Sequence, residues 1–253
     1  AVSRVGVGGP VALVVAASLV LANGAGPGTP PPTFWIAVAG GGLAQVLATV
    51  ATVSLFSLRN FAAGVAFTKT ETVLVALFSA AILGEAVSGA GVVAILVGLV
   101  GVLVLSVPGG RAALGAGWRA PALGLVAGAL FGLSAVGYRA ASLALPEGDA
   151  LMRASVTLAA VSAFQTLAML PWLRWRAPGE ITRVLARWRI TALVGATGML
   201  GSLGWFVAFT LQNAAYVRAV GQVELVFSAL VSWWVFRERV SGRELFGIAL
   251  IGG

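Results

Sequence analysis

The amino-acid sequence predicts an all-α membrane protein with a ten-helix inverted-repeat (5+5) architecture, of which about nine helices lie within these 253 residues. The prediction rests on the composition, on the recurrence of long apolar runs and on an internal repeat. Hydrophobic residues make up 59% of the chain and charged residues only 9%, whereas a soluble domain carries about 25% charged residues. Such a chain cannot cover itself with a hydrated surface.

Apolar runs of about 20 residues, the length that crosses a bilayer, recur along the whole chain. That many runs cannot all be buried in the core of a soluble protein of this size. A Pro- and Gly-rich stretch, 23–33, is expected to form an external loop, and 174–188 a short interfacial helix. We expect membrane helices at 5–22, 34–57, 61–84, 88–107, 121–141, 150–173, 189–211, 214–236 and 242–253.

An internal repeat sets the architecture. A shift of 153 residues aligns 35–98 with 188–251 without a gap. Shared apolar composition accounts for some identities, but it does not account for two aligned pairs of acidic residues. The identical pairs include Trp35 with Trp188, Asn60 with Asn213, Glu71 with Glu224, Glu85 with Glu238, and Val87-Ser88-Gly89 with Val240-Ser241-Gly242.

The repeat divides the chain into two domains, 1–107 and 120–253. The segment 121–141, shifted back by 153 residues, falls before residue 1. We therefore expect the first repeat to have one more helix upstream, and the second repeat to continue beyond Gly253. An odd number of helices per repeat means that the second copy enters the membrane from the opposite side.

The net charge of +8 comes from arginines in the short connections between apolar runs. One face carries nearly all of them, and the other face carries only Arg139 and Arg153. The positive-inside rule makes the Arg-rich face cytoplasmic and both ends of the complete protein external. The arginines assigned to the Arg-rich face are Arg4, Arg59, Arg111, Arg119, Arg174, Arg176, Arg183, Arg187, Arg189, Arg237, Arg239 and Arg243.

The chain has neither cysteine nor histidine. Disulfides, thiol chemistry, His-ligated metals and Ser-His-Asp triads are thereby excluded. No nucleotide-binding motif is present, so transport driven by ATP on this chain is not expected. We predict no enzymatic activity, no cofactor, no metal and no nucleic-acid partner, and we interpret the basic charge as a topology signal facing anionic lipid.

Two stretches resemble the EamA-type branch of the drug/metabolite transporter superfamily. One runs from Val65-Ala66-Phe67-Thr68-Lys69-Thr70-Glu71 to Leu83-Gly84-Glu85, and the other from Ala215-Tyr216 through Glu224 to Phe236-Arg237-Glu238. The resemblance covers essentially the whole chain. It implies ten helices, a central cavity, and export or exchange of small metabolites such as amino acids across a bacterial cytoplasmic (inner) membrane. Members are often drawn with cytoplasmic ends, whereas the arginine count indicates the opposite orientation.

Intramembrane charges are costly and are therefore functional candidates. At about 1.5 Å per residue, Glu71 lies roughly 16 Å and Glu224 about 19 Å from the Arg-rich face, close to the midplane. Transporters of inverted-repeat construction bind substrate at such a place. The candidates for binding substrate or protons are Lys69, Glu71, Arg218, Gln222 and Glu224.

Two interpretations of these charges remain open. In one, the acids accept a substrate ammonium or a coupling proton, since burial favours the neutral carboxyl form, while Lys69 or Arg218 holds a carboxylate or phosphate. In the other, Lys69 pairs with Glu224, or Arg218 with another acid, only to neutralise charge. Glu85 and Glu238, at helix ends, form either local salt bridges or a gate.

Other polar, aromatic and small residues allow similar alternatives. Aromatic and amide side chains would line a cavity or belong to an interfacial belt. The cavity-lining candidates are Asn60, Trp205, Phe209, Asn213 and Tyr216. Glycines at 124, 128 and 132, and at 195, 198, 201 and 204, allow close helix packing or a thin wall that moves.

The leading functional hypothesis is a secondary transporter that exports or exchanges a small polar metabolite, such as an amino acid, by alternating access. Its partners would be this substrate, the bilayer, protons as the coupling ion, and a second copy in a homodimer. One alternative is a proton-coupled drug or toxin efflux carrier with an aromatic cavity. Another is a membrane sensor or assembly subunit that transports nothing and whose intramembrane charges neutralise one another.

Overall fold

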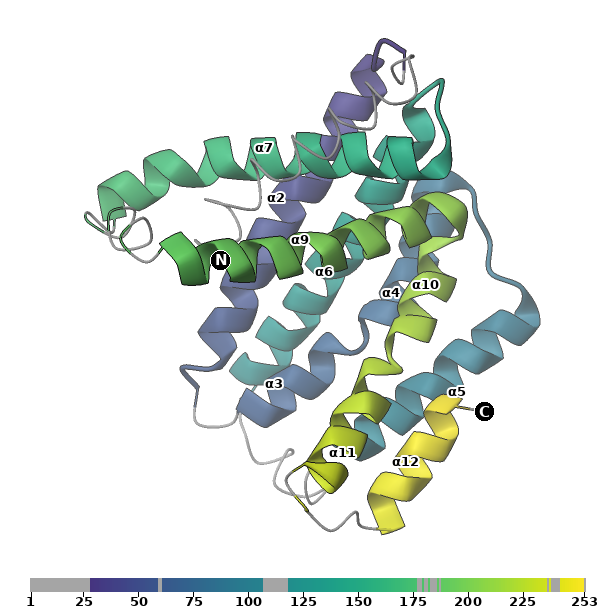
Figure 1. Ribbon diagram of the computed structural model, residues 1–253. Helices are drawn as coiled ribbons and strands as arrows, with labels where there is room; N and C mark the ends of the chain where they lie inside the picture. The colour runs from purple at the N-terminus through teal and green to yellow at the C-terminus, as the bar shows by residue number, and fades with distance from the viewer. Residues whose placement is uncertain are drawn as a thin grey trace. The chain divides into compact units, whose positions relative to one another are not determined.

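The structure, a computed structural model, describes residues 28–252 except for 59–60, 107–117, 177–178, 180–181, 183–185, 187, 236 and 238–241. Within these residues it contains helices and turns but no strand. The helices are α2 (Pro32–Leu55), α3 (Phe61–Thr68), α4 (Glu71–Phe78), the π-helix η1 (Ser79–Leu83), α5 (Gly89–Ser106), α6 (Arg119–Ala144), α7 (Ala150–Arg176), α9 (Trp188–Leu211), α10 (Ala214–Gly221), α11 (Glu224–Trp234) and α12 (Gly242–Gly252) (Figure 1).

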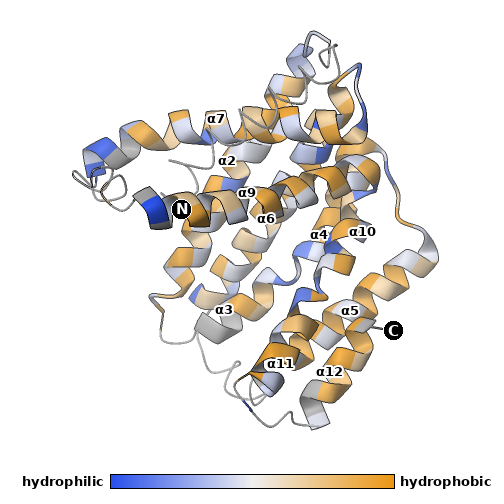
Figure 2. Cartoon of the chain, in the orientation of Figure 1, coloured by the Kyte–Doolittle hydropathy of each residue, from blue (hydrophilic) through white to orange (hydrophobic). Residues whose placement is uncertain are grey.

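Six helical segments in the described residues are long and apolar enough to cross a membrane. They are Pro32–Leu55, Gly64–Leu83, Arg119–Ala144, Ala150–Arg176, Thr191–Leu211 and Ala214–Val231, and Gly89–Val104 is a shorter apolar helix. Hydrophobic residues occur along all of these helices (Figure 2). Large apolar side chains such as Ile36, Leu167 and Leu200 are about 70% exposed. Helices of this kind satisfy their own backbone groups and present apolar side chains to lipid, so the protein is a multi-pass integral membrane protein.

The expected segments agree with these helices to within a few residues, with one difference. We expected 61–84 and 214–236 to be continuous, whereas the structure interrupts each of them with a two-residue turn. The expected segment 5–22 lies outside the described residues, and so does most of 174–188.

The chain divides into two compact units, and each unit combines distant parts of the sequence. The first contains residues up to Leu43 together with Gly137–Gln212. In it α7 and α9 lie side by side (Figure 1). Gln165 of α7 donates hydrogen bonds from Nε2 to the carbonyl oxygen of Gly42 (3.2 Å) and to the hydroxyl of Tyr138 (3.3 Å).

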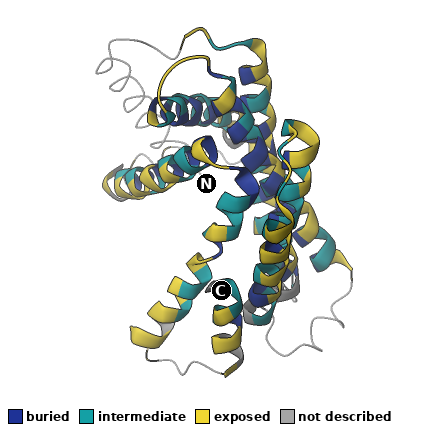
Figure 3. Ribbon diagram, turned by 90° about the vertical axis from the view of Figure 1, so that its right-hand side faces the viewer, coloured by how far each residue is buried: buried dark blue, intermediate teal, exposed yellow. Residues whose placement is uncertain are grey.

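The second unit contains Ala44–Val136 and Asn213–Gly253. It holds both interrupted helices and the paired helices α5 and α12. Helix α6, part of which lies in this unit, is the most buried of the six spans. Buried, intermediate and exposed residues alternate along the individual helices (Figure 3), as expected where one side packs on protein and another faces lipid.

Candidate functional site

Both interrupted helices break at the same place relative to the repeat. The first break is the turn Lys69-Thr70, and the second is Gln222-Val223, 153 residues later. At each break two backbone N–H groups bond to carbonyls three residues back instead of four. These bonds run from Lys69 to Ala66 (3.1 Å), Thr70 to Phe67 (3.2 Å), Gln222 to Ala219 (3.2 Å) and Val223 to Val220 (3.1 Å). The tightened turn offsets the two half-helices and leaves polar backbone near the middle of an apolar span.

An acidic residue opens the second half-helix at each break. Glu71 is the first residue of α4, and Glu224 is the first residue of α11. The N-terminus of a helix carries a partial positive charge, so it favours a carboxylate in its first turn. Hydrophilic residues accordingly gather at the two breaks within an otherwise apolar unit (Figure 2).

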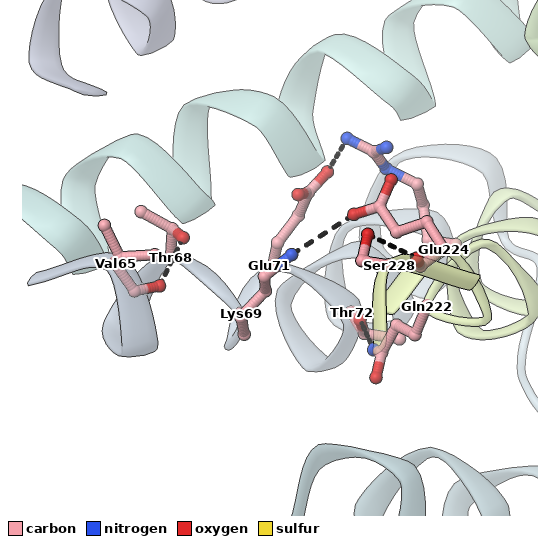
Figure 4. Close-up of polar contacts among 9 residues, drawn as sticks. Val65, Thr68, Lys69, Glu71, Thr72, Gln222, Glu224 and Ser228 are labelled. Atoms are coloured by element: carbon pink, nitrogen blue, oxygen red, sulfur yellow. Dashed lines mark hydrogen bonds and ion pairs between the residues drawn. The ribbon is translucent and has the colours of Figure 1, made fainter. Parts of the chain in front are cut away.

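The two acids bind the two intramembrane bases in crossed pairs. Lys69 Nζ lies 3.3 Å from Glu224 Oε1, and Arg218 forms an ion pair with Glu71. Each pair joins a residue of the first aligned segment to one of the second, and Figure 4 shows these side chains meeting between the broken helices. Charge neutralisation, one of the two interpretations left open by the sequence, is therefore present in this conformation. The four charges sum to zero.

The two ion pairs differ in their exposure. The side chain of Glu224 is 62% exposed, although its partner Lys69 is only 24% exposed. In the other pair, Arg218 is 23% and Glu71 is 18% exposed. Glu224 is thus the more exposed of the two acids, whereas Glu71 is held between protein groups.

A neutral contact accompanies the two ion pairs. Gln222 aligns with Lys69 in the repeat and is 7% exposed. Its Nε2 donates a hydrogen bond to the Oγ1 of Thr72, a buried residue one position beyond Glu71. The sequence identified Gln222 but not Thr72, because a single threonine in an apolar helix carries no distinguishing signal.

Helix α6 supports the first break through three glycines. A Cβ at Gly124 would overlap the backbone of Gly64 in α3, and one at Gly132 would lie 3.2 Å from Val75 in α4. Between them, a Cβ at Gly128 would lie 2.8 Å from the carbonyl oxygen of Thr68 and 3.4 Å from the amide nitrogen of Glu71. The close packing expected for this glycine series is therefore present, and it positions Glu71.

The glycines of α9 behave differently. A Cβ at Gly198, Gly201 or Gly204 would come within 4 Å of no other described atom. Among the residues that the structure describes, this series is therefore not a packing seam, although its spacing resembles that of α6. The difference lies in the neighbours of the helix and not in its own sequence.

Asn213 and Tyr216 join the start of α10 to the segment before α5. Asn213 caps α10 by accepting the N–H of Ala215 (2.8 Å), and its Nδ2 donates to the carbonyl oxygen of Glu85 (3.2 Å). The hydroxyl of Tyr216 accepts the N–H of Ser88 (3.0 Å) and lies 3.1 Å from its Oγ. Two residues expected to line a cavity thus make a polar joint between the two aligned segments.

The remaining candidates lie elsewhere. Trp205 and Phe209 belong to the first unit, where their ring centroids are 5.7 Å apart and Phe209 is 4% exposed. Asn60 and Glu238 lie outside the described residues. Within the described residues, no cluster of three or more acidic, cysteine or histidine side chains could hold a metal ion.

Arg139 has a role that its sequence position did not reveal. It is 9% exposed, and its Nη1 donates to the carbonyl oxygens of Phe209 (2.6 Å), Thr210 (3.4 Å) and Gln212 (2.7 Å). These carbonyls end α9, where the last turn has no helical donors. The buried guanidinium therefore caps the C-terminal end of α9.

Comparison with known proteins identifies the family. The model of the EamA-like transporter family matches residues 118–253, which is more than half of the chain. This chain belongs to the EamA-like transporter family, part of the drug/metabolite transporter superfamily. Members of this family are membrane transporters and not enzymes. No curated protein matches the chain.

A solved structure supports the fold. The chain is similar to a protein whose structure is described only as "Crystal structure of protein", with a TM-score of 0.66 and 19% sequence identity. The similarity covers 99% of this chain and 83% of that one. At this identity it bears on the fold alone.

Proposed function

We propose that this member of the EamA-like family is a secondary transporter that exports or exchanges a small zwitterionic metabolite, such as an amino acid, by alternating access. It would act in a bacterial cytoplasmic membrane as a ten-helix protein of two inverted repeats. The coincidence of the two helix breaks at a repeat offset of 153 residues supports the repeat architecture. Discontinuous helices at the midplane are typical of substrate sites in transporters with inverted repeats.

The observation that carries this proposal is the exposed carboxylate of Glu224 in contact with Lys69. An amino acid carries an ammonium and a carboxylate group, so it can replace each partner of such a pair with a group of the same charge. In this proposal the solute opens the pair of Lys69 and Glu224, because Glu224 is the more exposed acid.

The less exposed pair, Arg218 with Glu71, has a different role. Removing one partner of a pair that is largely shielded leaves the other charge unpaired, which is unfavourable. Arg218 and Glu71 therefore hold α10 against α4 while the substrate competes for Lys69 and Glu224. Proton coupling is part of the proposal, with the carboxyl groups of Glu71 and Glu224 as the proton-binding candidates.

The test measures flux of a panel of labelled amino acids into proteoliposomes, with and without a pH gradient. We expect saturable flux of one class, accelerated by the gradient, and at least a tenfold loss of this flux in Glu224→Gln. Ser228→Ala is the matched control, because Ser228 lies one turn further on α11 and, among the described residues, its hydroxyl bonds to the Glu224 carbonyl within the same helix and to no other element.

Each other outcome has a defined meaning. Wild-type flux in Glu224→Gln would refute the role of the exposed pair. Folded protein that moves no amino acid but moves cationic aromatic compounds would favour the drug efflux alternative. Folded protein that moves neither class would favour the sensor or assembly subunit.

A further inference from the structure

The two helix breaks have the same backbone geometry but unequal support. At the first break, Thr68 Oγ1 donates to the carbonyl of Val65 (2.6 Å), and Thr70 Oγ1 donates to that of Phe67 (2.7 Å). Helix α6 also packs on this break through Gly128. These contacts satisfy and fix the loosened backbone of the first break.

At the second break the residues aligned with Thr68 and Thr70 are Gly221 and Val223. Neither has a hydroxyl that could bond to a carbonyl. Gly221 also has the greatest backbone freedom of any residue, and Val223 is exposed. The second break is therefore the more deformable of the two.

Helix α10, before this break, is attached along its length. At its start, Asn213 donates to the Glu85 carbonyl, and Tyr216 bonds to Ser88. The ring of Tyr216 also packs directly on Gly91, where a Cβ would lie 2.6 Å from the ring. Further along, Arg218 pairs with Glu71. Gln222, in the break itself and next to Gly221, bonds to Thr72; because it adjoins the end of α10, it moves least when α11 changes direction.

Helix α11, after the break, packs beside α12 but makes few polar contacts. Among the described residues, the Lys69 to Glu224 pair is its single side-chain hydrogen bond or ion pair to another element. The other side-chain bond of α11, from Ser228 to the Glu224 carbonyl, is internal. Large apolar residues along the helix are exposed, including Phe227 (61%) and Trp234 (80%).

We propose that Gly221 is a positioning residue, the pivot about which α11 swings away from α4 while α10 stays attached. The Lys69 to Glu224 pair holds α11 in place, and opening this pair releases the helix together with Glu224. That the substrate opens the pair rests on the proposed function. The pivot itself does not, because any loss of the pair releases α11. Hinge motion of this kind concentrates in a few residues where a helix ends.

The chain contains no cysteine, so spin labels can be placed in pairs without a background. Two label pairs share Leu77 on α4, which is 59% exposed. One joins it to Leu230 on α11 (47% exposed), and the other joins it to Val220 on α10 (73% exposed). The first pair reports the position of α11 relative to α4, and the second reports that of α10. Both distances are measured by pulsed electron paramagnetic resonance in reconstituted protein.

We expect Glu224→Gln, and separately Lys69→Gln, to shift or broaden the distance between 77 and 230 by several ångströms and to leave the distance between 77 and 220 unchanged. Adding Gly221→Ala should lower the population of the displaced α11 conformation about fivefold. Alanine stabilises a continuous helix relative to glycine by about 1 kcal/mol. Gly198→Ala in the same backgrounds is the matched control, because its methyl group meets no described atom.

Equal changes in both distances would mean that α10 and α11 move as one body, and would overturn the proposal. No change in either distance in both Gln variants would also overturn it. These measurements need no substrate, so they stand if no amino acid is transported. In a transporting protein, Gly221→Ala should in addition lower the maximal rate several-fold with little change in KM, because the pivot acts on the moving step and not on binding.

Discussion

The packing of α6 on the first helix break can be tested by a single methyl group. In Gly128→Ala the new Cβ would lie 2.8 Å from the Thr68 carbonyl oxygen. Even favourable contacts between carbon and oxygen are about 3.3–3.6 Å long, so the two backbones must separate by about half an ångström. Both contacting atoms are backbone, so no side-chain rotation can relieve the overlap.

The magnitude follows from a comparison with Gly198→Ala on α9. Both variants gain the helix preference of alanine over glycine, about 1 kcal/mol. Only Gly128→Ala meets an overlap, which costs about 1–3 kcal/mol in a packed interior. At about 2–4 °C per kcal/mol for a chain of this size, the melting temperature of Gly128→Ala should lie about 2–12 °C below that of Gly198→Ala.

The assay is thermal unfolding of the two purified variants in the same detergent, together with flux in proteoliposomes. We expect Gly128→Ala to lose activity as well, because the displaced backbone includes the amide of Glu71, 3.4 Å from the new methyl group. Equal melting temperatures for the two variants would refute the close approach of α6 to the break.

Three further predictions concern single side chains. Glu71→Gln should abolish or uncouple flux in proteoliposomes while membrane insertion is retained, because glutamine cannot neutralise Arg218; normal flux dependent on the pH gradient would contradict this role. Arg139→Ala should lower the free energy of unfolding by about 2 kcal/mol or more, because each carbonyl left without a donor costs about 1–3 kcal/mol. An unchanged melting temperature would show that these carbonyls find other donors. Tyr216→Phe keeps the ring but loses the hydrogen bonds to Ser88, worth about 1 kcal/mol, so amide hydrogen exchange at the start of α5 should become faster. Unchanged exchange would show that these bonds do not hold α10 to the segment before α5.

The amino-acid sequence was enough to predict the membrane-spanning character of the chain, the positions of most helices and the presence of charged residues within apolar segments. These properties depend on local composition and on the fixed rise per residue of a helix. The shift of 153 residues also aligns Glu71 with Glu224 in the sequence. Residues two apart on a helix point in different directions, and Lys69 and Glu71 accordingly contact different partners.

Which charges meet, and where the helices break, depends on tertiary packing. Helix rise fixes the depth of a residue but not the neighbour beside it, so Lys69 could have reached either acid. No proline or glycine marks the first break, Lys69-Thr70, so the sequence does not reveal it. The structure shows that this turn and the turn Gln222-Val223 occupy aligned positions. The glycines of α6 and α9 have similar spacing, but among the described residues only those of α6 pack closely on other helices. Close packing depends on the neighbouring helix, which the glycine spacing within one helix does not specify.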